Sequence, residues 1–398
     1  MTTTSIGQTL PPQNPGAVAV DPSAIKVSRG QAISAMVMPI ALLLIVGFFA
    51  VASSGNYLSA QNLSQLAIEL SITAVLALGM LLVILPGHID LSAGSGVGLI
   101  GGIAAVLITS HGWPAWAAMA AGTAAGLLIW WGMGMIIIKE RVPAFIITLS
   151  GLLIFRGLHL LVIKNSTVPI VPGGQSNIYS LLTTYRLSPM VGLILTAVIG
   201  VILITVAIAQ RRSSGTPGHG ETMLMRAIVI SQCVLLLVLI CNGNGGLPLP
   251  VVILGTVTVA TWFLTRHTPF GRYLYAIGGN EEAAIVSGLP VHAITVGAFA
   301  IMGLLTALTG FLQTAYTGSS TTTIGNLMEL DAVAACVIGG TSLRGGRGTV
   351  GGVLLGSLII AALLNGMGLL GVSPEKKLIA RGTVLALAVW ADVRLRKQ

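Results

Sequence analysis

The sequence predicts an all-α protein, a polytopic transmembrane helical bundle of about 10–12 spans. Charged residues form only 8% of the 398 residues and hydrophobic residues 54%, more apolar surface than a soluble chain of this size can bury. The mean hydropathy is +0.94. The 51 glycines add a third observation, because small residues let membrane helices pack closely.

Apolar stretches recur along the chain at nearly the length that crosses ~30 Å of hydrocarbon. Backbone in lipid must satisfy its own hydrogen bonds, so we expect each stretch to be helical. The expected spans are 35–53, 66–86, 91–110, 115–138, 143–163, 189–209, 226–243, 248–265, 293–316, 331–343, 350–371 and 377–392. The short stretch 331–343 either crosses the membrane or forms a re-entrant segment.

The first 34 residues differ in composition from all that follows. Residues 1–34 are polar and rich in Pro, Thr and Ser, which predicts a disordered cytoplasmic tail. This lead is too long for the n-region of a signal peptide, so we expect the first span to be retained. Residues 35–392 then form the transmembrane domain.

Positive charges predict the orientation. If the N-terminus is inside, 14 of the 20 Lys and Arg residues face the cytoplasm and four face outward, while Arg156 and Arg381 fall within spans. The cytoplasmic group is Lys26, Arg29, Lys139, Arg141, Arg211, Arg212, Arg226, Arg266, Arg272, Arg344, Arg347, Arg394, Arg396 and Lys397, and the outer group is Lys164, Arg186, Lys376 and Lys377. The positive-inside rule therefore places both termini, and the loop 266–292, in the cytoplasm.

Several classes of function are disfavoured. The net charge of +9 lies mainly in loops, so topology explains it and we expect no nucleic-acid partner. Cys233, Cys241 and Cys336 have no paired spacing, so we expect no metal site. No catalytic constellation stands out, which disfavours an intramembrane enzyme, and we expect no cofactor. No phosphate-binding loop with a Gly-Lys-Ser/Thr ending occurs, so this chain should not bind or hydrolyse ATP by a P-loop.

One short polar segment lies between two long apolar stretches and carries two adjacent carboxylates. Asn280 is a favourable N-cap, and Glu281 and Glu282 follow in the first turn, where the helix macrodipole favours negative charge. Gly288 and Pro290 end the helix after about two turns. A chain that only had to reverse direction would not need a capped helix, so we expect this segment to dock a cytoplasmic partner.

Two Gly-rich stretches interrupt the apolar pattern. At the first, Asp90 or Ser92 caps the next helix, and the junction is either a discontinuous element beside a translocation path or an ordinary cytoplasmic turn. Two acids precede the second stretch, which suggests irregular backbone lining a cavity. The breaks expected at 94–102 and 339–352 are similar, which suggests two related halves and hence a two-fold internal repeat.

Few polar side chains lie inside the expected spans. Gln313, Thr314, Tyr316 and Asn365 either hydrogen-bond a polar solute or join neighbouring helices. Ionisable groups such as Glu69 fall mostly within two turns of a span end, where snorkelling or capping explains them. A proton-coupled carrier would need a carboxylate or His deep in a span, and no clear one appears.

Three ordered motifs give the chain a resemblance. They are Gly-His-Ile-Asp-Leu-Ser-Ala-Gly-Ser at 87–95, Ala-Ile-Gly-Gly-Asn-Glu-Glu-Ala-Ala at 276–284 and Val-Ile-Gly-Gly-Thr-Ser-Leu-Arg-Gly-Gly at 337–346. Over residues 35–392 the chain resembles bacterial ABC sugar importer permeases of the ribose/xylose type. His88 and Ala93 depart from the usual pattern of that family.

The resemblance implies a multi-pass protein of the bacterial inner membrane that moves a monosaccharide, D-xylose or a similar pentose, and is not itself an enzyme. The implied partners are cytoplasmic ABC ATPase subunits, an external sugar-binding protein and a second copy of the permease. The implied ATPase-coupling residues, within the loop 266–292, are Asn280, Glu281, Glu282, Ala283, Ala284, Ser287, Gly288 and Pro290. The expected translocation-path residues are Asp90, Ser92, Ser95, Gln313 and Asn365.

The alternative is a secondary sugar carrier driven by protons or sodium. The capped acidic helix and the lack of a clear deep titratable group favour the ATP-driven importer.

Overall fold

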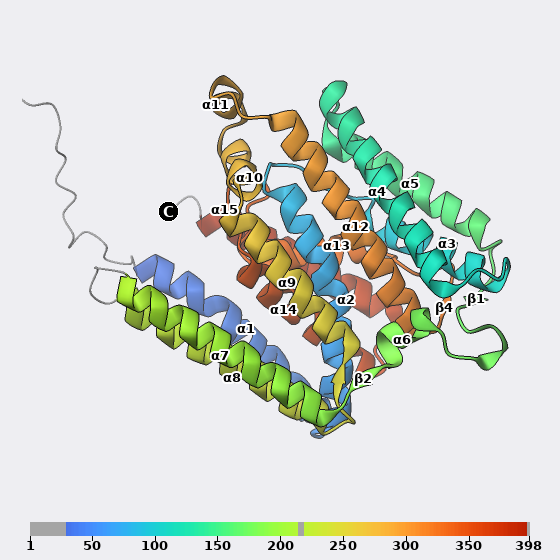
Figure 1. The fold of residues 1–398 in the computed structure, drawn as a ribbon, viewed down its shortest axis with the longest axis horizontal. Helices are drawn as coiled ribbons and strands as arrows, with labels where there is room; N and C mark the ends of the chain where they lie inside the picture. The colour runs from blue at the N-terminus through green and yellow to red at the C-terminus, as the bar shows by residue number, and fades with distance from the viewer. Residues whose placement is uncertain (1–28, 214–218, 396–398) are drawn as a thin grey trace, which may run out of the picture.

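The computed structural model describes the fold of residues 29–213 and 219–395, which form a bundle of helices with two very short sheets (Figure 1). The helices are α1 (Arg29–Ala52), α2 (Ala60–Ile84), α3 (Ala93–Thr109), α4 (Ala115–Lys139), α5 (Ala144–Val162), α6 (Ile178–Thr184), α7 (Pro189–Ser213), α8 (His219–Asn242), α9 (Leu249–His267), α10 (Pro269–Gly279), α11 (Glu281–Val286), α12 (Val291–Thr317), α13 (Met328–Ile338), α14 (Val350–Leu369) and α15 (Pro374–Leu395). Two 3-10 turns occupy Asn56–Leu58 and Pro172–Gly174.

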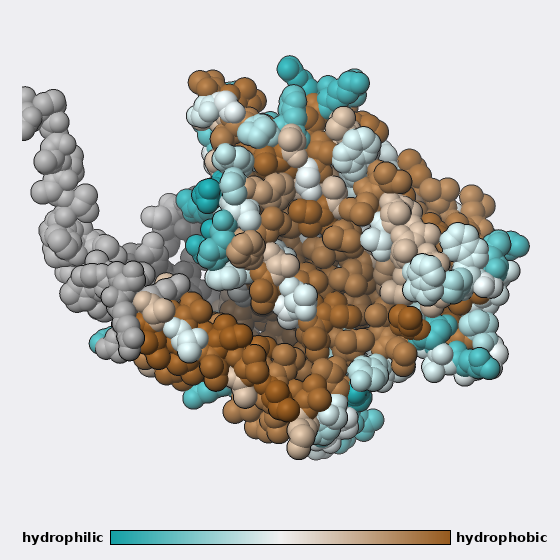
Figure 2. Space-filling model, in the orientation of Figure 1, coloured by the Kyte–Doolittle hydropathy of each residue, from teal (hydrophilic) through white to brown (hydrophobic). Residues whose placement is uncertain are grey.

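The prediction of a polytopic helical membrane protein is confirmed. Each expected span overlaps one of these helices. Within the described residues, eight helices are long and apolar enough to cross a membrane: α2, α4, α5, α7, α8, α9, α12 and α14. Figure 2 shows apolar side chains over the flank formed by α7, α9 and α12, with hydrophilic side chains gathered toward the ends of the bundle. This is the pattern that a lipid-facing surface requires.

Helix α2 is the centre of the bundle. In its most apolar stretch 83% of residues are buried, against 17% in α7 and in α8, so α2 is surrounded by protein while the paired helices α7 and α8 lie at the periphery. α2 packs against α8, α9, α12, α13 and α14. A helix placed there touches most of the bundle, and any polar residue on it faces a neighbour or a cavity rather than lipid.

The start of the chain differs in part from the expectation. Helix α1 begins at Arg29, six residues before the expected span and inside the expected tail. The rest of that tail, residues 1–28, lies outside the described residues.

Of the two Gly-rich breaks expected in the bundle, the one at 339–352 is confirmed by the non-helical connection between α13 and α14, whereas the first lies elsewhere than predicted. Residues 94–102 are helical, inside α3, so the first expected break is wrong; the chain is instead non-helical just before them, between α2 and α3. The stretch expected at 331–343 is an 11-residue helix, α13. At 1.5 Å per residue this is ~16 Å long, about half of the hydrocarbon core. The remainder of that crossing is the irregular segment 318–327, which connects α12 to α13.

Segment 318–327 is accommodated because α3 offers it a surface without side chains. A Cβ atom added to Gly98 would lie 2.7 Å from the carbonyl oxygen of Ile324, and one added to Gly94 would lie 2.5 Å from that of Gly325. The backbone of the segment therefore rests directly on the helix. Irregular backbone at membrane depth is tolerated where protein buries it in this way.

The two short sheets lie at the end of α9 and α12 away from α11 (Figure 1). Strand β1 (Val168–Pro169) pairs antiparallel with β4 (Ser319–Ser320), and β2 (Arg186–Leu187) with β3 (Leu247–Pro248). They join connections that are distant in sequence. The opposite end carries α10 and α11, so the expected cytoplasmic loop and the expected outer loop 164–188 lie at opposite ends of the bundle.

Candidate functional site

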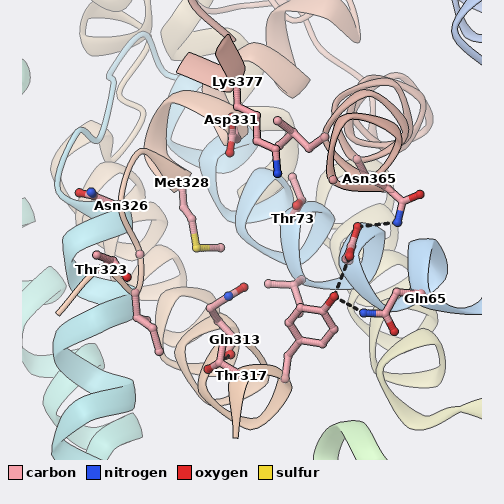
Figure 3. A pocket seen from close by; sticks show the side chains of 18 of the residues that line it. Gln65, Thr73, Gln313, Thr317, Thr323, Asn326, Met328, Asp331, Asn365 and Lys377 are labelled. Carbon is pink, nitrogen blue, oxygen red and sulfur yellow. Dashed lines mark hydrogen bonds between the residues drawn. The ribbon is translucent and has the colours of Figure 1, made fainter. Parts of the chain in front are cut away.

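A polar cavity of about 530 Å³ opens between α2, α12, α14, α15 and the irregular segment before α13 (Figure 3). Its volume is in the range of ordinary small-molecule sites. Helix α2 contributes a polar stripe, Asn62, Gln65, Glu69 and Thr73, at spacings of three and four residues. This spacing places all four side chains on one face of the helix. These four are half-buried, in contrast to the buried remainder of the helix core.

A chain of hydrogen bonds organises this wall of the cavity. The carboxylate of Glu69 accepts from the Tyr316 hydroxyl at 2.6 Å and from the Asn365 side-chain amide at 3.1 Å. Gln65 donates to the same Tyr316 hydroxyl. Asn62 donates to the side-chain oxygen of Asn365 at 3.0 Å. Each side chain is therefore held in place by another, as a preorganised polar site requires.

The opposite wall carries paired charges. The Arg381 guanidinium on α15 lies 3.1 Å from the Asp331 carboxylate on α13. Lys377, one turn before Arg381, also lines the cavity, as does Met328 at the start of α13 (Figure 3). The cavity thus offers both hydrogen-bond donors and acceptors, with an apolar patch between them. Donors and acceptors in a cavity of this size suit a polar, hydroxyl-rich solute.

The structure brings together only some of the expected path residues. Gln313 and Asn365 line the cavity. Ser95 instead lines a smaller cavity of about 130 Å³ on the α5 side of segment 318–327, beside Arg156 and Glu329. The irregular segment therefore separates two polar spaces.

Asp90 and Ser92 line neither of these cavities. Asp90 is fully buried, and its carboxylate accepts from the Ser92 backbone at 2.8 Å, the Ser92 hydroxyl at 2.6 Å and the Trp130 indole at 2.5 Å. Asp90 therefore fixes the start of α3 from within. Ser92 is the N-cap residue of α3, but its side chain makes no cap hydrogen bond, so the expected side-chain cap is not formed there.

The sequence reasoning missed Glu69. It was expected near a span end, but α2 begins at Ala60, so Glu69 lies nine residues or ~14 Å into the helix. The missed signal was the periodicity, because four polar residues repeat on one face of an otherwise apolar helix. The expectation that no carboxylate lies deep in a span is therefore wrong at Glu69.

The predicted docking helix is present as α11. The Asn280 side chain accepts from the Ala283 amide at 2.9 Å, so the N-cap is confirmed. Ala284 is buried and anchors the helix, whereas both glutamates are exposed. Figure 1 shows α11 projecting from one end of the bundle.

Beyond the predicted residues, α11 exposes two apolar side chains. Ile285 is 56% and Val286 88% exposed. Within the described residues these two apolar side chains, beside two carboxylates, remain exposed, as expected of a docking element.

The chain matches the family described as branched-chain amino acid transport system / permease component over residues 62–389. It is 38% identical to the xylose transport system permease protein XylH of Haemophilus influenzae, covering 91% of this chain and 96% of that one. It is 36% identical to XylH of Escherichia coli K12 over 91% and 92% of the two chains. It is 35% identical to the ribose import permease protein RbsC of Escherichia coli K12 over 89% and 92%. No solved structure matches the chain.

Proposed function

This chain belongs to the permease family just described, as a transport subunit of an ATP-driven sugar importer in the inner membrane, and from that premise we propose that it carries a pentose through the cavity beside α13. The relatives that match over nine-tenths of the chain are permeases for xylose and for ribose. Both sugars are uncharged pentoses, so the proposal is a five-carbon sugar.

The observation that carries the proposal is the Glu69 network. A sugar hydroxyl both donates and accepts, and the wall formed by Gln65, Glu69, Tyr316 and Asn365 presents acceptors and donors in alternation. The four groups already satisfy one another, so a passing sugar exchanges hydrogen bonds instead of having to form all of them anew. Weak, exchangeable binding suits a conduit better than a high-affinity receptor.

The driving force comes from partners. Cytoplasmic ABC ATPase subunits dock on α11 and supply the energy, an external sugar-binding protein delivers the substrate, and a second copy of the permease completes the path. Closure of the ATPase pair displaces α11 and moves the helices on either side of it in a rigid-body transition. The exposed acids and apolar residues of α11 support this role.

The test is uptake of labelled xylose and ribose into proteoliposomes that hold the permease, its ATPase and its binding protein. Uptake that requires ATP is expected for the wild type. Glu69→Gln should reduce it about 10- to 100-fold, because an amide nitrogen replaces one of the carboxylate acceptors and cannot bond both donors. Glu140→Gln, an exposed acid at the cytoplasmic end of α4, is the matched control and should transport normally.

The alternative function is the ion-driven carrier, which the match to the xylose and ribose permeases disfavours. Uptake driven by a proton or sodium gradient without ATP would replace the proposal with that function. Normal ATP-driven uptake by Glu69→Gln would retain the importer but remove this cavity from the path.

A further inference from the structure

Three segments distant in sequence meet backbone to backbone at the base of α11. A Cβ atom added to Gly278 would overlap both the carbonyl oxygen of Leu85 and the amide nitrogen of Gly346. A Cβ added to Gly345 would lie 2.8 Å from the Cα of Gly278 and 2.8 Å from the same Leu85 oxygen. The Gly346 amide donates to that oxygen at 2.9 Å. Leu85, Gly278, Gly345 and Gly346 are hereafter the glycine junction.

The residues of the glycine junction belong to three different segments of the fold. Gly278 lies in the last turn of α10, two residues before the cap of α11. Leu85 is the C-cap of α2 and opens the non-helical connection to α3. Gly345 and Gly346 belong to the turn that connects α13 to α14. Helix α10, which leads directly into the docking helix α11, is therefore in direct contact with the connection before α3 and the connection after α13.

A second tether reinforces the first. The Tyr275 hydroxyl, one turn before Gly278, donates to the carbonyl oxygen of Gly348 at 2.8 Å. Burial raises the pKa of Tyr275 above its ordinary value, and Arg266 only partly opposes this, so the hydroxyl keeps its proton. α10 is thus held to the α13–α14 turn at two points on the same face.

Resting on the proposed function, we propose that Gly278 is a positioning residue for transport, which transmits the displacement of α11 to the connections before α3 and after α13. Contact between backbones leaves no rotamers to absorb a shift, and close-packed contacts move as a unit. A side chain at Gly278 would push these three segments apart and weaken the contact between them. Gly279 is the matched control position, because a Cβ atom added there meets nothing within 4 Å.

The test compares Gly278→Ala with Gly279→Ala in the assembled complex with its ATPase and binding protein. The readout is the sugar transported per ATP hydrolysed, together with the thermal unfolding of each variant. Gly278→Ala should lower this ratio about 5- to 150-fold, the usual range of a coupling free energy, while ATP hydrolysis continues. Gly279→Ala should keep the wild-type ratio.

A gentler variant covers the case in which Gly278→Ala does not fold. Tyr275→Phe adds no atoms and removes only the tether to Gly348, so it should lower the same ratio at unchanged assembly. A wild-type ratio in Gly278→Ala, or in Tyr275→Phe where Gly278→Ala fails to assemble, would overturn the proposal. Failure of the importer function would look different, because then the wild-type complex itself would show no ATP-driven uptake.

Discussion

On α3, single glycines determine where the chain can run. Gly94 and Gly98 present bare backbone to the carbonyl groups of segment 318–327, while Gly101, on the same helix, faces Gly310 of α12. The glycines were expected to permit close helix contact, and here they also permit close contact with the irregular segment 318–327. Removing a side chain from a membrane helix costs some helix propensity, about 1 kcal/mol per Gly relative to Ala, which this contact must offset.

We predict that Gly98→Val disrupts the bundle. Its side chain would displace Ile324 and the ring of His159, and such overpacking typically costs about 1–3 kcal/mol. The melting temperature in detergent should fall by several degrees and uptake should be lost. Gly132→Val on α4 is the control, because nothing lies within 4 Å of its added Cβ, and it should unfold like the wild type. Equal melting temperatures for the two variants would contradict the packing described for segment 318–327.

At the scale of elements, α11 is a six-residue helix held by its cap and one buried alanine. So short a helix is not stable alone, and its position depends on α10 and α12, which it contacts. A shift of α10 or α12 therefore moves α11, and with it the exposed face on which a partner would bind.

We predict that Glu282→Lys lowers association with the ATPase, and the ATPase stimulation that follows, by about tenfold or more. Glu282 is exposed, so the change should leave membrane insertion intact. The measurement is co-purification with the ATPase and ATP hydrolysis in the presence of sugar-loaded binding protein. Glu140→Lys, exposed next to α4, controls for charge reversal outside α11. Wild-type transport by Glu282→Lys would remove the docking role.

Local signals predicted the elements better than the cavity. The cap at Asn280 and the apolar spans follow from short-range chemistry; the cap is confirmed, and eight of the twelve expected spans are helices long and apolar enough to cross a membrane. The start of α2 was placed six residues too late, because polar residues on its cavity face lowered its apparent hydropathy. Hydropathy is an average over all faces of a helix, so it cannot show that Glu69 points inward. Segment 318–327 can be non-helical because its backbone packs against α3. That is a tertiary contact, which no local sequence pattern encodes.

At the scale of the whole molecule, α2 at the centre and α7 with α8 at the edge define an inside and an outside within the membrane plane. The predicted two-fold repeat stays a prediction, although a short helix follows a non-helical connection in each half, α3 after α2 and α13 after α12. The orientation across the membrane is likewise predicted by charge.

We predict that α11 is cytoplasmic and the turn Pro172–Gly174 external. Ser287→Cys should react with a membrane-impermeant maleimide only in inverted vesicles, and Gln175→Cys only in intact spheroplasts, because both positions are exposed at opposite ends of the bundle. The exposed Cys233 should first be replaced by Ser to remove background labelling. Labelling of Ser287→Cys in intact cells would reverse the orientation.

The unwound segment before α13 has a consequence for how the protein is made. Its backbone is not helical, and α13 is too short to cross alone, so this crossing has no stable place in bare lipid. The surface that accepts it belongs to α3, which leaves the ribosome far earlier. Helix α3 is therefore already synthesised when segment 318–327 emerges and can pack against it. In a circularly permuted chain that began with α13, this short helix would be synthesised before α3 was present to pack against.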